Sequence, residues 1–158
     1  MRIIGVDPGT AITGFCILDR EQKQLKLLDY GCIRTSKDLS DGERLKQISS
    51  DMKILIKKWK PTASSVEKLF FSKNTKTAIS VAQARGVIMQ NLEENEIPQR
   101  EFTPNEIKVS VCGYGKADKK MVQSMVKNIL GLNTVPKPDD AADAMAAAIC
   151  LANTMEIS

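Results

Sequence analysis

Four acidic residues stand where the surrounding sequence is apolar and where carboxylates could act together. Asp7 ends the β-branched run RIIGVD, immediately before the turn PGT, and Glu67 ends the run ASSVE. Asp140 and Asp143 fall in the Ala-rich stretch PKPDDAADAMAAAICLANT, three residues apart and therefore on one face of a helix. Asp139, directly before them, is the predicted N-cap of that helix.

Each acid also has an ordinary structural explanation when it is taken alone. Asp7 could stabilise the DPGT turn through its own backbone, and Glu67 could project into solvent from an edge strand. Carboxylates in the first turn suit the helix dipole, which accounts for Asp139 and Asp140. Asp143 fits this explanation less well, because it lies deeper in the helix among small residues that predict close packing.

Taken together, the acids predict a metal site. If the first and fourth strands are neighbours, Asp7 and Glu67 emerge at one edge of the sheet, and a C-terminal helix across that edge adds Asp140 and Asp143. Four carboxylates in one pocket cannot all stay ionised unless cations neutralise them. Oxygen ligands without His or Cys favour Mg²⁺ or Mn²⁺. Two such ions about 4 Å apart are a known arrangement for in-line displacement at phosphorus.

Composition narrows the chemistry further. The 158 residues include no histidine, which excludes Ser-His-Asp and Cys-His nucleophile pairs and imidazole general bases. Four widely spaced cysteines without a CxxC pair favour free thiols in a reducing cytoplasm over zinc or disulfides. The length predicts a single domain spanning residues 1–158, and no apolar run is long enough to span a membrane. A net charge of +4 is weak support for a polyanionic partner.

The elements that must position the acids follow from periodicity and turn signals. Three hairpin-linked strands are followed by helix, strand, helix, strand and further helices. The expected strands cover residues 2–7, 13–19, 24–35, 63–71 and 99–102, and the expected helices cover 40–59, 77–95, 103–111, 119–131 and 139 onward. Ser40 or Asp41 caps the first helix, and Thr103 caps the third, with Pro104 following. This order predicts an α/β fold with a mixed five-stranded sheet, antiparallel at one edge and parallel at the other, and helices on both faces.

Six motifs occur in order along nearly the whole chain: GVDPGTAITGF, GCIRT, VEKLFFSKN, AQARGV, VCGYGKADKKMVQSMV and DDAADAMAAAI. In these motifs the chain resembles the RuvC family, bacterial Holliday-junction resolvases with a ribonuclease H-like fold. The resemblance implies a Mg²⁺-dependent homodimeric endonuclease, with Mn²⁺ as a substitute, that cuts four-way DNA junctions by symmetric paired nicks in recombination and repair. A branch-migration helicase complex is a further possible partner.

Carried over position by position, the resemblance makes Asp7, Glu67, Asp140 and Asp143 the metal-binding, catalytic acids. Asp140 is preferred to Asp139 because DAAD matches the family spacing. One metal would activate water and the other would stabilise the leaving 3′ oxygen, without a covalent intermediate. In this interpretation the lysines neutralise charge and do not act as nucleophiles.

Two further segments are candidates for holding DNA. Residues 105–127 are rich in lysine and glycine, which could form a solvated helix face or bind phosphates. The resemblance favours Lys108 and Lys119 as backbone contacts, and Lys116 belongs to the same basic segment. Phe70, with Phe71 second, could be core or could stack on unpaired bases at the junction, as an aromatic residue here does in the family.

Other functions remain open at this point. Arg85 and Gly86 are interpreted as packing residues, and the segment AQARGVIMQ around them is, by resemblance, part of a dimer contact. GVDPGTAITGF also resembles the phosphate-gripping hairpin of actin-like ATPases and sugar kinases, but those folds need a second domain. The YqgF group of RuvC-like nucleases, linked to ribosomal RNA maturation, shares the fold. A catalytically dead junction binder is the non-enzymatic alternative.

Overall fold

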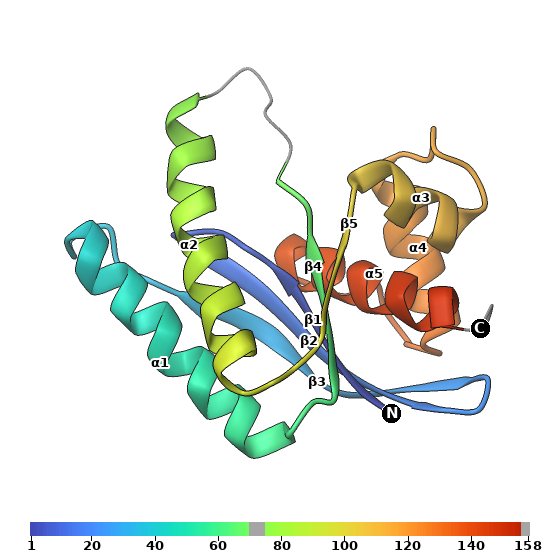
Figure 1. Ribbon diagram of the computed structural model, residues 1–158. Helices are drawn as coiled ribbons and strands as arrows, with labels where there is room; N and C mark the ends of the chain where they lie inside the picture. The colour runs from blue at the N-terminus through green and yellow to red at the C-terminus, as the bar shows by residue number, and fades with distance from the viewer. Residues whose placement is uncertain (70–74, 156–158) are drawn as a thin grey trace.

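The computed structural model describes residues 1–69 and 75–155, which form a layered structure around a mixed five-stranded sheet (Figure 1). The strands are β1 (Arg2–Asp7), β2 (Ile12–Glu21), β3 (Gln24–Arg34), β4 (Ala63–Glu67) and β5 (Gln99–Phe102). Their order across the sheet is β3-β2-β1-β4-β5. The pairs β1–β2 and β2–β3 are antiparallel, and β1–β4 and β4–β5 are parallel, which confirms the predicted sheet.

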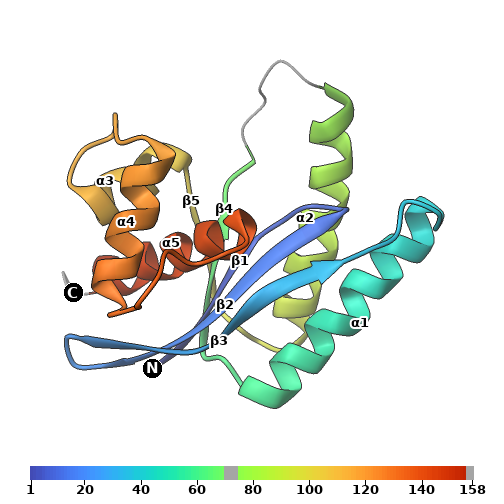
Figure 2. The same ribbon diagram turned by 180° about the vertical axis from the view of Figure 1, so that it is seen from behind.

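Helices cover both faces of this sheet. They are α1 (Asp41–Trp59), α2 (Thr75–Glu94), α3 (Pro104–Cys112), α4 (Lys119–Ile129) and α5 (Asp139–Thr154). Helices α1 and α2 lie on one face, whereas α5 lies on the other with α3 and α4 packed against it (Figures 1 and 2). None of the described helices is long and apolar enough to cross a membrane.

The central strand β1 is buried on both sides because each face carries its own core. Side chains alternate along a strand, so Ile3 joins the cluster under α5, whereas Ile4 and Val6 join the cluster under α1 and α2. All three side chains are fully buried. Burial on both faces explains why RIIGV reads as a continuous apolar run with little alternation.

The predicted helix caps at the starts of α1 and α3 are confirmed. Ser40 accepts a hydrogen bond from the Glu43 amide while the Glu43 carboxylate accepts one from the Ser40 amide. Thr103 and Glu106 form the same reciprocal pair, with Pro104 in the first turn. Each cap is worth about 1 kcal/mol, because it satisfies amides that the helix leaves unpaired.

Three details of the predicted elements were wrong. The strand predicted over 63–71 ends at Glu67. The Lys68 amide still donates a hydrogen bond to the Phe102 carbonyl of β5, but Lys68 and Leu69 are not strand residues, and residues 70 and 71 lie outside the described part of the chain. Helix α2 begins at Thr75 and not at Thr77. Asp139 is the first residue of α5 and not its N-cap, since Pro138 holds that position without a side-chain cap and the Asp139 carboxylate binds α4.

Candidate active site

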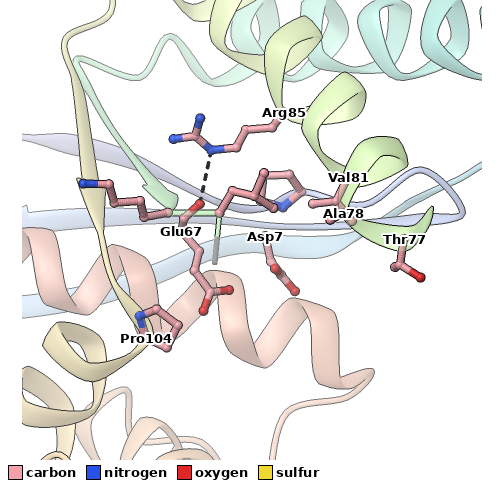
Figure 3. Close-up of a pocket in the computed structure, with 10 residues that line it drawn as sticks. Asp7, Glu67, Thr77, Ala78, Val81, Arg85 and Pro104 are labelled. Carbon is pink, nitrogen blue, oxygen red and sulfur yellow. Dashed lines mark hydrogen bonds between the residues drawn. The ribbon is translucent and has the colours of Figure 1, made fainter. Parts of the chain in front are cut away.

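Two neighbouring parallel strands bring Asp7 and Glu67 together. In the register of β1 and β4, Val6 lies beside Val66, so the next residue of each strand emerges at the same edge of the sheet. Both acids are the last residues of their strands. In Figure 3 the two carboxylates point toward the same space, below the strand ends. The adjacency of the first and fourth strands considered from the sequence therefore accounts for half of the acid cluster.

Helix α5 adds the other two acids because glycines in β1 and β2 let it lie directly on the sheet. A Cβ atom on Gly14 would stand 2.0 Å from the carbonyl oxygen of Asp140, and one on Gly5 would stand 2.2 Å from that of Ala144. The buried Ser65 hydroxyl of β4 also donates a 2.6 Å hydrogen bond to the Ala147 carbonyl. The small residues on one face of α5 thus allow its first turns, with their carboxylates, to pack against the strand ends.

Asp7 and Glu67 are close enough to influence each other's ionisation. The pKa of Asp7 is raised to about 8, first by burial and then by the charges of Glu67, Asp143 and Asp140. Burial also raises the pKa of Glu67, against the opposing influence of its hydrogen bond with Asp7 and of Lys119. We place the shared proton on Asp7, because its pKa is raised by every neighbour. The nearby lysines offset only part of the burial of Glu67, because its pKa remains raised overall.

Asp143 belongs to the same electrostatic cluster, and Lys119 of α4 partly compensates it. Burial raises the pKa of Asp143 to about 6, although Lys119 acts to lower it. The Lys119 Nζ lies 3.8 Å from Asp143 Oδ2 and 3.2 Å from Asp139 Oδ2. Burial acts to lower the pKa of Lys119, but these carboxylates, with a contribution from Asp140, raise it overall. The ammonium group therefore remains charged beside the acids.

The two adjacent aspartates of α5 face different surroundings. Asp139 binds α4, since it accepts a 3.1 Å hydrogen bond from the Gln123 amide as well as pairing with Lys119, and its side chain is 61% exposed. Asp140 instead lines a cavity with the β1–β2 loop. This geometry favours Asp140 over Asp139 as the acid nearer the cluster, as the spacing DAAD predicted.

A cavity of about 350 Å³ opens at the strand ends (Figure 3). Asp7 and Glu67 line it together with residues of the first turns of α2 and with Arg85. The Arg85 guanidinium pairs with Glu101 of β5, and its Nε lies 3.5 Å from the Glu67 carbonyl oxygen, the contact dashed in Figure 3. Arg85 was predicted to be a packing residue only, but it also supports the backbone that carries Glu67.

A second cavity, of about 250 Å³, lies on the α3–α4 side of the acids. Lys108 and Lys119 line it with Glu67 and Asp143. Two of the predicted DNA-binding lysines therefore stand beside the carboxylates. Lys116 is exposed in the turn between α3 and α4 and lines neither this cavity nor the one containing Asp7. The predicted wedge residues Phe70 and Phe71 lie outside the described residues.

The donor set suits a hard divalent cation. Carboxylate oxygens without imidazole or thiolate favour Mg²⁺ or Mn²⁺, and the raised pKa values of Asp7, Glu67 and Asp143 show that positive charge would stabilise the cluster. Within residues 1–69 and 75–155, however, no three acidic, histidine or cysteine side chains are arranged to hold one ion as they stand. An ion bound by these acids would draw their side chains closer together.

Comparison with known proteins identifies the family. The family model for crossover junction endodeoxyribonuclease RuvC matches residues 3–151. This chain belongs to the RuvC family. RuvC of Fusobacterium nucleatum is 49% identical over 155 residues, covering 98% of this chain and 82% of that protein. RuvC of Halothermothrix orenii is 47% identical over 158 residues, covering 100% of this chain and 96% of that protein.

Solved RuvC structures share the whole architecture. Thermus thermophilus RuvC superimposes with a TM-score of 0.93 at 30% identity, covering 99% of this chain and 96% of that one. The same protein in complex with a Holliday junction substrate gives a TM-score of 0.95 at 29% identity and the same coverage. The predicted ribonuclease H-like fold is confirmed. RuvC proteins are metal-dependent nucleases as a family.

Sequence reasoning missed some of the residues that line the site. Arg85, Val81 and Thr77 recur every four residues, so they share one face of α2, and that face lines the cavity containing Asp7. Helical spacing from Thr77 could have placed Arg85 beside the acids. Lys68 also lines this cavity, directly after Glu67. Its position could not be predicted, because the strand was expected to continue past it.

Proposed function

We propose that this chain is a Holliday-junction resolvase that hydrolyses DNA phosphodiester bonds with Mg²⁺ held by Asp7, Glu67, Asp140 and Asp143. The single observation that carries the proposal is the pair of half-buried acids at the ends of β1 and β4, whose pKa values stay raised even though Lys119 and Lys108 lie near Glu67. Such a pair is stabilised by binding cations. Membership of the RuvC family supplies the reaction class, and the relative solved with a Holliday junction supplies the substrate.

The chain's own residues divide into three roles. The four acids hold the metal, with two Mg²⁺ ions per site and Mn²⁺ as a substitute. Lys108 and Lys119 neutralise the phosphate that enters beside Glu67. When bound, the metal supplies an activated water nucleophile and charge stabilisation for the leaving 3′ oxygen. Hydrolysis by water needs no covalent intermediate, which suits a chain without histidine.

Symmetric paired nicks require two sites, and we propose a homodimer built on α2. The exposed side of this helix carries Ile79, which is 63% exposed, and the exposed small residues Ala82 and Gly86. A Cβ atom on Gly86 would meet nothing within 4 Å of this chain, so the glycine is not needed for packing inside one copy. Small residues at this position suit close approach by a second helix.

The remaining parts of the proposal rest on the family and on the sequence. Residues 1–158 act as a single nuclease domain, located in the cytoplasm, in homologous recombination and DNA repair. Phe70, with Phe71, stacks on unpaired bases at the opened junction, and Lys116 contacts DNA farther from the cut. A branch-migration helicase complex is a further partner.

The test uses a mobile four-way DNA junction labelled on each strand in turn, with wild type, Glu67→Gln and the control Asp51→Asn. Asp51 lies on α1, on the opposite face of the sheet from α5. We expect paired symmetric nicks with wild type and Asp51→Asn in Mg²⁺, and none with EDTA or Glu67→Gln. Tight binding without nicks in Mg²⁺ or Mn²⁺ would indicate a dead junction binder. Cleavage of structured RNA alone would indicate the RNA-processing group.

A further inference from the structure

A third cavity, of about 490 Å³, adjoins the acid site on the side away from α3 and α4. It is lined by the β1–β2 loop, by Arg44 of α1, by Lys76 and Ser80 of α2, and by Asp140. Thr77 and Val81 line both this cavity and the one that contains Asp7 and Glu67. The two spaces are therefore neighbours across the first turns of α2.

A chain of hydrogen bonds fixes Arg44 at this cavity. Its Nε donates to the Thr35 hydroxyl at 2.8 Å, and that hydroxyl donates to the Thr10 carbonyl at 2.6 Å. The Thr10 hydroxyl in turn donates to the Ser80 carbonyl of α2 at 2.8 Å. Thr10 and Thr35 are both buried. The guanidinium is thus held by a network that joins α1, the end of β3, the β1–β2 loop and α2.

The network uses only part of the hydrogen-bonding capacity of the Arg44 guanidinium. Its Nε is bonded, but no carboxylate pairs with Arg44 anywhere in the described part of the chain. Arg44 is half-buried, so part of its charged side chain is withdrawn from water without a carboxylate beside it. Its planar guanidinium, pinned at one nitrogen, can present the remaining donors as a fork that matches two oxygens of a phosphate.

Three adjoining cavities form a row across the edge of the sheet. Lys108 and Lys119 line the first, Asp7 and Glu67 the second, and Arg44 and Lys76 the third. The first two share Glu67 and Pro104, and the last two share Thr77 and Val81. Positive side chains therefore flank the carboxylates on both sides, an arrangement that fits a DNA strand with successive phosphates crossing the acids.

We infer that Arg44, assisted by Lys76, binds a backbone phosphate of the cleaved DNA strand next to the phosphate that is cut. This inference rests on the proposed function. The Asp140 carboxylate lines the same cavity and repels an anion, so the phosphate lies on the Arg44 side and away from α5. The contact positions the strand without reading its sequence, because it is made to the backbone.

The test is a double-mutant cycle between the protein and the DNA backbone. Wild type, Arg44→Gln and the control Lys46→Gln bind four-way junctions that carry a single neutral methylphosphonate at each position around the cut. Lys46 is exposed on the same helix, and replacing it removes the same charge. Binding is measured in Ca²⁺, with the strands checked afterwards to be uncut, and unfolding curves verify that each variant is folded.

One methylphosphonate position, beside the cut, should weaken wild-type binding about tenfold and leave Arg44→Gln binding unchanged. Arg44→Gln should also lower the slope of log affinity against log salt by about one, and Lys46→Gln should not lower it. The inference fails if Arg44→Gln loses cleavage or stability while its salt slope and methylphosphonate profile match wild type, because Arg44 would then be structural only.

Two further observations keep the test decisive. If Arg44→Gln does not fold, the exposed Lys76→Gln takes its place and should show a weaker loss at the same methylphosphonate position. An unchanged profile for that variant overturns the inference. Wild-type cleavage of the unmodified junction separates this failure from a failure of the proposed function, which would abolish paired nicks with the wild-type protein itself.

Discussion

Replacing Asp7 by asparagine should stabilise the metal-free protein while abolishing its proposed activity. Asparagine keeps the shape of the side chain and can donate a hydrogen bond, as a protonated aspartic acid can. It removes a group that must otherwise stay protonated or repel its neighbours. The structure thus predicts that the substitution raises the stability of the metal-free protein while it removes the proposed activity.

The magnitude follows from the pKa of Asp7, which is 3.8 for an ordinary aspartate and about 8 in the folded protein. Because the unfolded chain releases this proton first, stability falls as the pH rises from about 4 to about 8. Each pH unit costs about 1.4 kcal/mol, so the upper limit at pH 7 is about 4 kcal/mol. Asp7 is partly exposed and shares its proton with Glu67, and we therefore expect about half, or about 2 kcal/mol.

The assay is thermal unfolding in EDTA. At pH 7, about 2 kcal/mol corresponds to a Tm about 4–8 °C higher for Asp7→Asn than for wild type in a chain of this length. At pH 4.5 the difference should shrink to about a quarter, because this pH lies only about 0.7 units above the ordinary aspartate pKa of 3.8 and little of the pH-dependent cost has built up. Asp51→Asn controls for the loss of one negative charge and should change stability by less than about 0.5 kcal/mol.

Adding Mg²⁺ extends the experiment. If the acids bind Mg²⁺ in the folded form, as proposed, the Tm of wild type should rise with the logarithm of the Mg²⁺ concentration, and the Tm of Asp7→Asn should rise much less. A Tm for Asp7→Asn equal to or below that of wild type at pH 7 in EDTA would refute the reasoning. It would show that Asp7 is not held under electrostatic strain by its neighbours.

Three further predictions concern the elements around the acids. Gly14→Ala should lower the free energy of unfolding, measured with denaturant, by about 1–3 kcal/mol or more, because its Cβ would stand 2.0 Å from the Asp140 carbonyl and push α5 off β2. An unchanged denaturant midpoint would mean that α5 does not need this close approach. Lys119→Met should make Asp143 harder to ionise, and NMR titration of Asp143 in the metal-free protein should show its pKa above the wild-type value of about 6; an equal or lower value would contradict the ion pair. Gly86→Arg should convert the proposed dimer to monomers in sedimentation, whereas Gly42→Arg, also at an uncrowded glycine but on α1, should leave it intact; dimers in both variants would remove α2 from the interface.

The strands of the sheet could be predicted from the sequence, because each strand follows from a short run of neighbouring residues. The strands β1 and β4 are short apolar runs with an acid at the end, and once these strands are taken as neighbours, Asp7 and Glu67 could be placed side by side from the sequence. The spacing of Asp140 and Asp143 on one helix face was equally local.

What could not be predicted depends on contacts between distant segments. Asp139 was expected to cap α5, but Lys119 and Gln123, twenty and sixteen residues away, engage its carboxylate instead. Arg44 gave no signal in the sequence, because its position depends on hydroxyl groups supplied by a strand end and a loop. The apolar residues after Glu67 looked like more strand, and only the position of the sheet edge shows where pairing stops.

The close packing of α5 against the sheet has a consequence for the synthesis of the protein. The helix contributes to the core beneath it and to the acid cluster at once, and it follows all five strands in the chain. A nascent or truncated chain that ends before α5 carries Asp7 and Glu67 but neither Asp140 nor Asp143, and it lacks much of one hydrophobic core. Such a chain should be less stable and lacks two of the four proposed metal ligands. If the proposal holds, incomplete products of synthesis should not cleave DNA, because the packing of α5 completes the core and the acid site together.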